Sequence, residues 1–185
     1  MAGDRYASLG DVVMKQQIVL IGLPGAGKTT VGALVAEKLG CPFVDIDAVI
    51  VRRMQMPVAR IFAELGETRF RTIERDAVND ALAAEPSVIV PGGGWAAQEG
   101  NLAPVRDSSF VIYLKCMVTT AVKRIEGGAS RPLMVGEDPV DTMRKLMLER
   151  EPWYQQADVE VKNDMRTAQQ TADDIVVLAR QQAGW

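Results

Sequence analysis

The sequence is informative first through what it lacks, because its 185 residues include no histidine, only 2 cysteines and only 5% aromatic residues. Without histidine, the chain has neither the commonest general base nor the commonest zinc ligand. Cys41 and Cys116 show neither metal-site nor disulfide spacing, and we interpret them as free thiols in a reducing compartment. Functions built on histidine or on paired cysteines are therefore excluded.

Strong charge of one sign and long apolar runs are missing as well. Lysine and arginine number 21 against 24 aspartates and glutamates, a formal net charge of −3, which argues against a basic nucleic-acid surface. No apolar run approaches the roughly 20 residues that cross a bilayer. The first residues have no apolar segment typical of a signal peptide. We therefore expect a cytoplasmic protein with no nucleic-acid and no membrane partner.

The sequence contains short apolar runs that alternate with segments in which apolar residues recur every three or four positions, as in a helix. This alternation predicts an α/β fold with a parallel sheet and helices on both of its faces. Residues 1–15 are interpreted as an N-terminal extension and residues 16–185 as a single domain. Residues 127–140 have little periodicity and many helix breakers, so they predict a long mobile loop. The candidate strands are 16–22, 42–47, 87–90, 109–115 and 158–162, and helical spacing recurs over 31–39, 57–84 (broken near Gly66) and 167–181.

The segment GLPGAGKTT, residues 22–30, carries the strongest chemical signal in the chain. It matches the phosphate-binding loop pattern and lies between a predicted strand and a predicted helix, the context which that pattern requires. Glycines let backbone N–H groups approach phosphate oxygens, and the helix that follows presents its positive end. Lys28 supplies a charge near the outer phosphates and Thr29 a hydroxyl for Mg²⁺. The segment predicts nucleotide binding rather than a glycine-rich turn with a surface lysine.

The residues that follow the predicted strands indicate which class of nucleotide-binding protein this is. The guanine-reading Asn-Lys-x-Asp element of GTPases is missing, and the third strand ends in Pro91 and three glycines rather than in an aspartate. A metal-orienting carboxylate must then come from Asp45 or Asp47, after the second strand. In an open α/β sheet, ligands gather at the carboxyl ends of the strands. We expect the phosphate loop, the two aspartates and Gly92–Gly94 to meet at this edge.

Several motifs follow one another along the chain: GLPGAGKTT, FVDIDAVI, IFAELGETRFRTIE, the triple glycine 92–94, RPL at 131–133 and REPWY at 150–154. Together they resemble the shikimate kinases, over about residues 17–178. The resemblance implies a nucleoside-monophosphate-kinase-like fold of the P-loop NTP hydrolase type, three layers with a five-stranded parallel sheet and a mobile lid. It also implies that ATP, with Mg²⁺, phosphorylates the 3-hydroxyl of shikimate to give shikimate 3-phosphate and ADP, a step of aromatic amino-acid biosynthesis. The expected state is a monomer.

The resemblance also implies roles for individual residues. Asp47 binds the substrate hydroxyls and is counted as catalytic with Lys28 and Arg131. Arg71 and Arg150 hold the substrate carboxylate, Gly92, Gly93 and Gly94 line its ring, and the substrate region spans about 47–80. Thr29 and Asp45 serve the metal. Arg131 comes from a lid at about 127–140. The nucleotide set is Gly25, Ala26, Gly27, Lys28, Thr29, Thr30, Arg124 and Arg131.

The residues alone leave other interpretations open. Arg71 and Arg150 could be solvated charges on helices. Asp47 could merely cap a helix, Gly92–Gly94 could be only a turn, and Arg131 could be an ordinary loop residue. Trp95, a departure from the family, is expected to narrow or reshape the substrate pocket.

Rival functions also stay open at this point. A gluconate kinase is disfavoured because the family's His-Pro element is missing, and an adenylate kinase because no Asp-Gly-Phe-Pro-Arg segment is present. A non-catalytic nucleotide-binding module shares the same fold class, and fold alone does not exclude it.

Overall fold

The computed structural model describes residues 15–127 and 138–185. Their elements alternate between strand and helix for most of the chain, as the sequence predicts. In chain order they are β1 (Gln17–Ile21), α1 (Lys28–Leu39), β2 (Phe43–Asp45), α2 (Ile46–Met54), α3 (Val58–Leu82), β3 (Val88–Val90), the 3₁₀ turn η1 (Trp95–Ala97), α4 (Leu102–Ser108), β4 (Ser109–Lys115), α5 (Val118–Glu126), α6 (Pro139–Tyr154), β5 (Val159–Lys162) and α7 (Ala168–Gln182).

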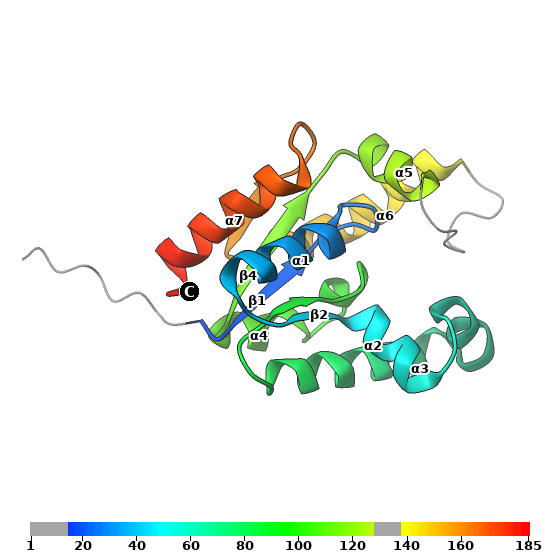
Figure 1. Ribbon diagram of the computed structural model, residues 1–185. Helices are drawn as coiled ribbons and strands as arrows, with labels where there is room; N and C mark the ends of the chain where they lie inside the picture. The colour runs from blue at the N-terminus through cyan, green and yellow to red at the C-terminus, as the bar shows by residue number, and fades with distance from the viewer. Residues whose placement is uncertain (1–14, 128–137) are drawn as a thin grey trace, which may run out of the picture.

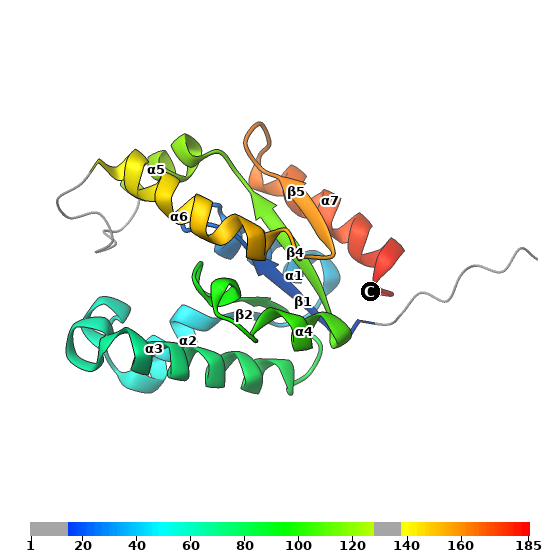
Figure 2. The ribbon, with the colours of Figure 1, turned by 180° about the vertical axis from the view of Figure 1, so that it is seen from behind.

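The five strands form one parallel sheet in the order β2-β3-β1-β4-β5. The predicted five-stranded parallel sheet of a three-layer α/β fold is therefore confirmed. Helices α1 and α7 cover one face of the sheet (Figure 1). Helices α3, α4 and α6 cover the other face, which Figure 2 shows from behind. No helix in the described part of the chain is long and apolar enough to cross a membrane.

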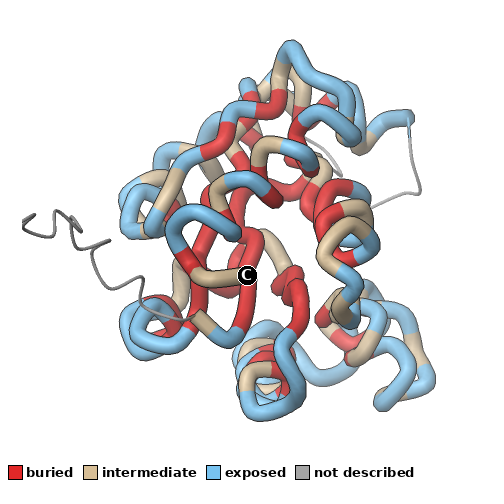
Figure 3. Tube along the Cα trace, turned by 60° about the vertical axis from the view of Figure 1, so that its left-hand side comes forward, coloured by how far each residue is buried: buried red, intermediate tan, exposed pale blue. Residues whose placement is uncertain are grey.

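Apolar residues on both faces of the sheet explain this layering. Along β1, Ile18 and Leu20 belong to the core cluster under α1 and α7, whereas Val19 and Ile21 belong to the cluster on the opposite face. Successive strand residues point to opposite faces, so a continuous apolar run fits a strand covered on both sides. The strands accordingly form the buried centre of the molecule, with exposed helix surfaces around them (Figure 3).

Local chemistry explains where the elements begin and end. Gly40 ends α1 in a left-handed conformation, with φ of 70°, which glycine adopts without steric cost. The predicted helix over 57–84 is α3, and its predicted break is at Gly66, where φ is 76° and ψ is 167°. Thr167 caps α7 through a reciprocal capping box with Gln170. Such helix ends can be predicted from sequence because each signal acts between residues only a few positions apart.

Three predicted segments differ from the structure or lie outside it. The second strand was expected over 42–47, but β2 ends at Asp45 and the next residue begins α2. Residues 128–137, most of the predicted lid and including Arg131, lie outside the described residues, while Pro139 already begins α6. Of the N-terminal extension, only Lys15 is described, and its N–H donates to the carbonyl of Ala183 at 3.0 Å. The assignment of residues 1–15 as an extension stays a prediction.

Candidate active site

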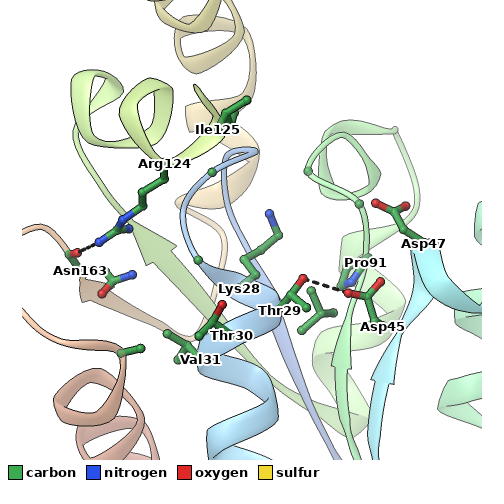
Figure 4. A pocket seen from close by; sticks show the side chains of 16 residues that line it. Lys28, Thr29, Thr30, Val31, Asp45, Asp47, Pro91, Arg124, Ile125 and Asn163 are labelled. Carbon is green, nitrogen blue, oxygen red and sulfur yellow. Dashed lines mark hydrogen bonds between the residues drawn. The ribbon is translucent and has the colours of Figure 1, made fainter. Parts of the chain in front are cut away.

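A cavity of about 560 Å³ opens at the carboxyl edge of the sheet. It brings together the phosphate loop after β1, the aspartates after β2 and the glycines after β3. Figure 4 shows Arg124 and Asn163 at one end, Lys28 in the middle and Asp47 at the other end. Its lining comprises Gly25, Gly27, Lys28, Thr29, Thr30, Val31, Asp45, Asp47, Val90, Pro91, Gly92, Gly93, Arg124, Ile125, Asn163 and Ala168. Ten of the residues predicted from the sequence are thereby found around one cavity.

The phosphate loop joins β1 to the first turn of α1. Lys28 is the first residue of α1, and its ammonium group donates hydrogen bonds to the carbonyls of Gly22, at 2.8 Å, and Leu23, at 2.9 Å. Although it lines the cavity, Lys28 is only 8% exposed. Its own loop therefore orients the lysine. The N-terminal end of α1 adds the positive end of the helix dipole, which favours anions at this position.

Thr29 and Asp45 form a pair across the cavity floor. The Thr29 hydroxyl donates a hydrogen bond to Asp45 Oδ2 at 2.9 Å (Figure 4). The other oxygen of Asp45 accepts the N–H of Ala48 at 3.1 Å and so caps α2. The cap is thus Asp45, and the alternative interpretation of Asp47 as the capping residue is wrong. A hydroxyl and a carboxylate this close suit Mg²⁺, which prefers oxygen ligands and keeps several waters or substrate oxygens.

Asp47 lies in the first turn of α2 and faces the glycines that follow β3. A Cβ at Gly92 would lie 3.3 Å from Asp47 Oδ1 and 2.4 Å from Glu74 Oε1. A side chain at residue 92 would collide with Glu74 and crowd Asp47, so the glycine permits the close approach of these carboxylates. Gly92 is therefore more than a turn residue.

Glu74, from α3, is a buried carboxylate that the sequence analysis missed. It is 1% exposed, and its Oε1 has no hydrogen-bond partner among the described residues. Burial raises the pKa of Glu74, while the hydrogen bond and charge of Arg71 oppose this rise and the charge of Asp47 adds to it. Only its sequence spacing of three from Arg71 on a helix could have indicated the pairing.

Arg71 is fixed against the glycine loop rather than solvated. Its guanidinium donates to Glu74 at 2.8 Å and to Glu67 at 3.0 Å, and its side chain is 18% exposed. A Cβ at Gly94 would lie 2.7 Å from Arg71 Nη2. The carbon of the guanidinium lies 5.8 Å from the ring centre of Phe62, within cation–π range. The interpretation of Arg71 as an ordinary surface charge is therefore wrong.

Arg150 approaches the same carboxylate from α6. Its charge lowers the pKa of Glu74, so the two arginines predicted to act together both interact with one buried acid. Arg150 also acts on Tyr154, whose pKa burial raises to about 12 against the lowering effect of Arg150. Tyr154 in turn donates a hydrogen bond to the carbonyl of Gly93. The C-terminal turn of α6 is thus fixed to the glycine loop that follows β3.

Other predicted residues lie elsewhere. Ala26 is a fully buried residue of the phosphate loop and is absent from the cavity lining, although its carbonyl accepts hydrogen bonds from Arg124 and Asn163. Trp95 is 2% exposed within the core cluster, so the expectation that its ring reshapes the pocket is wrong: a large apolar side chain gains more from burial in the core. Arg131 is outside the described residues.

Comparison with known proteins identifies the family to which this arrangement belongs. The family model for shikimate kinase matches residues 24–179. The chain belongs to the shikimate kinase family. A shikimate kinase of Moorella thermoacetica is 40% identical over 162 residues, which cover 88% of this chain and 93% of the relative. The chain is accordingly an enzyme with shikimate kinase activity, which uses ATP and serves aromatic amino-acid biosynthesis.

Solved structures support the same family and fold. A shikimate kinase from Acinetobacter baumannii, determined in complex with shikimate, superposes with a TM-score of 0.85 at 33% identity, covering 90% of this chain and 93% of that one. A gluconokinase from Sinorhizobium meliloti superposes with a TM-score of 0.61 at 19% identity, covering 93% and 96% of the two chains. The second likeness concerns the fold alone. Shikimate kinase and gluconokinase therefore share this scaffold, and the residues of the cavity must distinguish them.

Proposed function

We propose that the cavity transfers the γ-phosphoryl group of ATP to the 3-hydroxyl of shikimate, with the roles given below for its residues. The observation that carries this proposal is that a phosphate loop and the carboxylate of Asp47 line one cavity with the Gly92–Gly93 backbone. A phosphate donor and a hydroxyl acceptor can therefore meet in a single cavity. Membership of the shikimate kinase family supports shikimate as the molecule that accepts the phosphoryl group.

The nucleotide side is formed by the phosphate loop and α1. Backbone N–H groups from Gly25 to Thr30 and the helix dipole favour the β- and γ-phosphates. Lys28, held by two carbonyls of its own loop, exchanges one of these neutral partners for a phosphate oxygen. Its charge then offsets the negative charge on the transferring group. Arg124 lies at the far end of the cavity, where the adenine is expected.

Mg²⁺ fits the hydroxyl of Thr29 and the carboxylate of Asp45. Within the described residues no group of three histidine, cysteine, aspartate or glutamate side chains gathers around one point. Mg²⁺ would be held by few protein groups and would keep waters and nucleotide oxygens as its other ligands, which matches this sparse donor set. When bound, it neutralises charge on the β- and γ-phosphate oxygens. We propose Thr29 as a direct ligand and Asp45 as a ligand through water.

On the acceptor side, Asp47 orients the attacking hydroxyl. In the transfer, the oxygen of that hydroxyl forms a bond to the γ-phosphorus while the bond from this phosphorus to the β–γ bridging oxygen breaks. ADP leaves with the bonding electron pair, and the hydroxyl proton passes to the carboxylate of Asp47. Arg71 and Arg150 bind the acceptor carboxylate, for which a planar guanidinium is suited. A catalytic role for Arg131 stays a prediction from the resemblance.

A comparison of possible acceptors, each supplied separately, tests this proposal against the other kinase activities. The purified protein is given ATP and Mg²⁺ with shikimate, quinate, gluconate or AMP, and ADP release is followed. We expect ADP release with shikimate far above the level with gluconate or AMP. Comparable rates with gluconate or AMP would assign the cavity to another acceptor, and release with shikimate no greater than with buffer would refute the proposal.

A further inference from the structure

Asn163 follows β5 and lies buried between the phosphate loop and α7, a position for which the catalytic roles above provide no explanation. It is 2% exposed. Its side-chain amide donates to the carbonyl of Ala26 at 2.7 Å, and its side-chain oxygen accepts the hydroxyl of Thr171 at 2.9 Å. Its backbone N–H donates to the carbonyl of Lys115 at 2.9 Å. The backbone N–H and both polar atoms of the side chain are therefore all hydrogen-bonded.

The carbonyl of Ala26 receives a second hydrogen bond, from Arg124. One guanidinium nitrogen of Arg124 donates to this carbonyl at 3.1 Å. Another donates to the backbone carbonyl of Asn163 at 2.8 Å, the bond that Figure 4 draws. Two side chains from outside the phosphate loop thus fix the direction of one carbonyl within it. Burial makes such a pair costly to break, because a carbonyl left without partners cannot turn to water.

The direction of this carbonyl determines the direction of the next N–H. A trans peptide is planar, so the carbonyl of Ala26 and the N–H of Gly27 point in opposite directions. Figure 4 shows Asn163 and Arg124 on one side of the loop and the side chain of Lys28 on the other. With the Ala26 carbonyl turned toward Asn163, the N–H of Gly27 points away from Asn163, to the side where Lys28 lies.

We propose that Asn163 is a positioning residue of the phosphate site: by holding the carbonyl of Ala26 it keeps the N–H of Gly27 directed at the β-phosphate of the nucleotide. Asn163 acts through the loop and does not itself bind phosphate. Thr171 contributes by fixing which way the Asn163 amide is turned. This inference rests on the proposed nucleotide side of the cavity and is independent of the acceptor.

The test compares ligands that differ in phosphate content. Affinities for ADP and for adenosine are measured by calorimetry in the wild type, Asn163→Ala and Thr171→Val. Loss of one buried donor should weaken ADP binding about tenfold in Asn163→Ala and less in Thr171→Val. Adenosine affinity should stay unchanged in both variants, because adenosine has no phosphate for Gly27. Thr171→Ser retains the hydroxyl and should restore ADP affinity to the wild-type value.

A buried polar residue remote from the cavity provides the control. Gln17 is 1% exposed, and its amide donates to the carbonyls of Leu82, Ala84 and Glu85. Gln17→Ala should lose stability without losing ADP affinity. Equal weakening of ADP and adenosine in Asn163→Ala, or unchanged ADP affinity in both Asn163→Ala and Thr171→Val, would overturn the inference. If Asn163→Ala does not fold, the Thr171→Val and Thr171→Ser pair decides between the same outcomes.

Failure of the proposed reaction is a separate result. Wild-type protein that releases no ADP with shikimate, yet loses ADP affinity selectively in Asn163→Ala, would refute the acceptor assignment and leave the role of Asn163 in place. Conversely, normal phosphorylation of shikimate together with an unchanged ADP affinity in Asn163→Ala would support the acceptor assignment and refute the role of Asn163.

Discussion

The hydroxyl of Tyr154, the last residue of α6, donates a hydrogen bond to the carbonyl of Gly93. This contact joins residues 61 positions apart and fixes the glycine loop to the helix that carries Arg150. Tyr154 is fully buried, and its ring centre lies 5.1 Å from that of Tyr113. The backbone on which the acceptor is proposed to rest is thus held by a side chain that does not line the cavity.

Tyr154→Phe should therefore affect acceptor binding more than nucleotide binding. Removing the hydroxyl takes one donor from a buried carbonyl, which should lower the free energy of unfolding by about 1–2 kcal/mol. The KM for shikimate should rise several-fold while the KM for ATP changes little. Steady-state kinetics with either substrate varied, together with thermal unfolding, measure these effects.

Tyr113→Phe is the matched control for that variant. The hydroxyl of Tyr113 donates to Glu151 and not to the glycine loop. Its loss should reduce stability without raising the KM for shikimate. If the two variants raise this KM equally, the hydrogen bond to Gly93 has no special role in the acceptor site.

Asp47→Asn should lower kcat strongly and leave ATP affinity almost intact. Asparagine keeps the shape and can still hydrogen-bond a hydroxyl, but it is a far poorer acceptor of the proton. General-base contributions of this kind amount to about 10²–10⁴-fold in rate. Single-turnover measurements of phosphoryl transfer with saturating substrates separate this step from product release. A variant with near-normal kcat would remove Asp47 from its catalytic role.

The substitutions Arg71→Ala and Arg150→Ala should each weaken the binding of shikimate. Loss of one charged hydrogen-bonded contact costs about 1.5–3 kcal/mol, so the Kd for shikimate should rise by roughly one to two decades. Arg75→Ala, an exposed position on the same helix as Arg71, is the control and should change this Kd little. Calorimetric titration with shikimate distinguishes them; unchanged affinity in both Arg71→Ala and Arg150→Ala would refute the proposed carboxylate binding.

The ion pair between Glu151 and Lys115, 2.8 Å long, predicts a pH-dependent contribution to stability. Burial alone would raise the pKa of Glu151, but hydrogen bonds from Lys115 and Tyr113 outweigh it, and the pKa lies below the ordinary value of 4.5. A carboxylate whose pKa is lower in the folded state stabilises the fold above its unfolded pKa, and this stabilisation is lost as the pH falls through the folded pKa. The stability advantage of wild type over Glu151→Gln should therefore be present at pH 7 and shrink below pH 4.5.

Urea unfolding at a series of pH values measures this advantage. Glu149→Gln, at an exposed neighbouring position, should show no comparable pH-dependent difference from wild type. An advantage of wild type over Glu151→Gln that is the same at pH 7 and pH 3 would contradict the lowered pKa.

What the sequence could predict depended on the distance over which each signal acts. The strand 109–115 was predicted with its observed bounds because its apolar run is continuous. The strand predicted over 42–47 was too long because the side chain of Asp45 caps the next helix, and an aspartate in a strand and an aspartate cap look alike in sequence. Residues with a motif were found, and most of them line the cavity.

The supporting residues were missed for the opposite reason. Asn163 contacts Ala26 across 137 positions of sequence, and no local pattern distinguishes such an asparagine from one in a turn. Glu74 reads as one of several charges on a helix, and only its burial separates it from them. Trp95 lies next to the glycine loop in sequence, yet its ring packs into the core, since adjacency along the chain does not fix side-chain direction.

The protein is proposed to phosphorylate the 3-hydroxyl of shikimate within a single cavity. The most direct measurement is phosphorus NMR of the products formed from shikimate, ATP and Mg²⁺, with proton–phosphorus correlation to locate the ester. We expect a single phosphate monoester on the 3-hydroxyl, formed in the same amount as ADP and formed much more slowly in Asp47→Asn. ADP formed with free phosphate and no ester, or an ester on a different hydroxyl, would refute the proposed reaction.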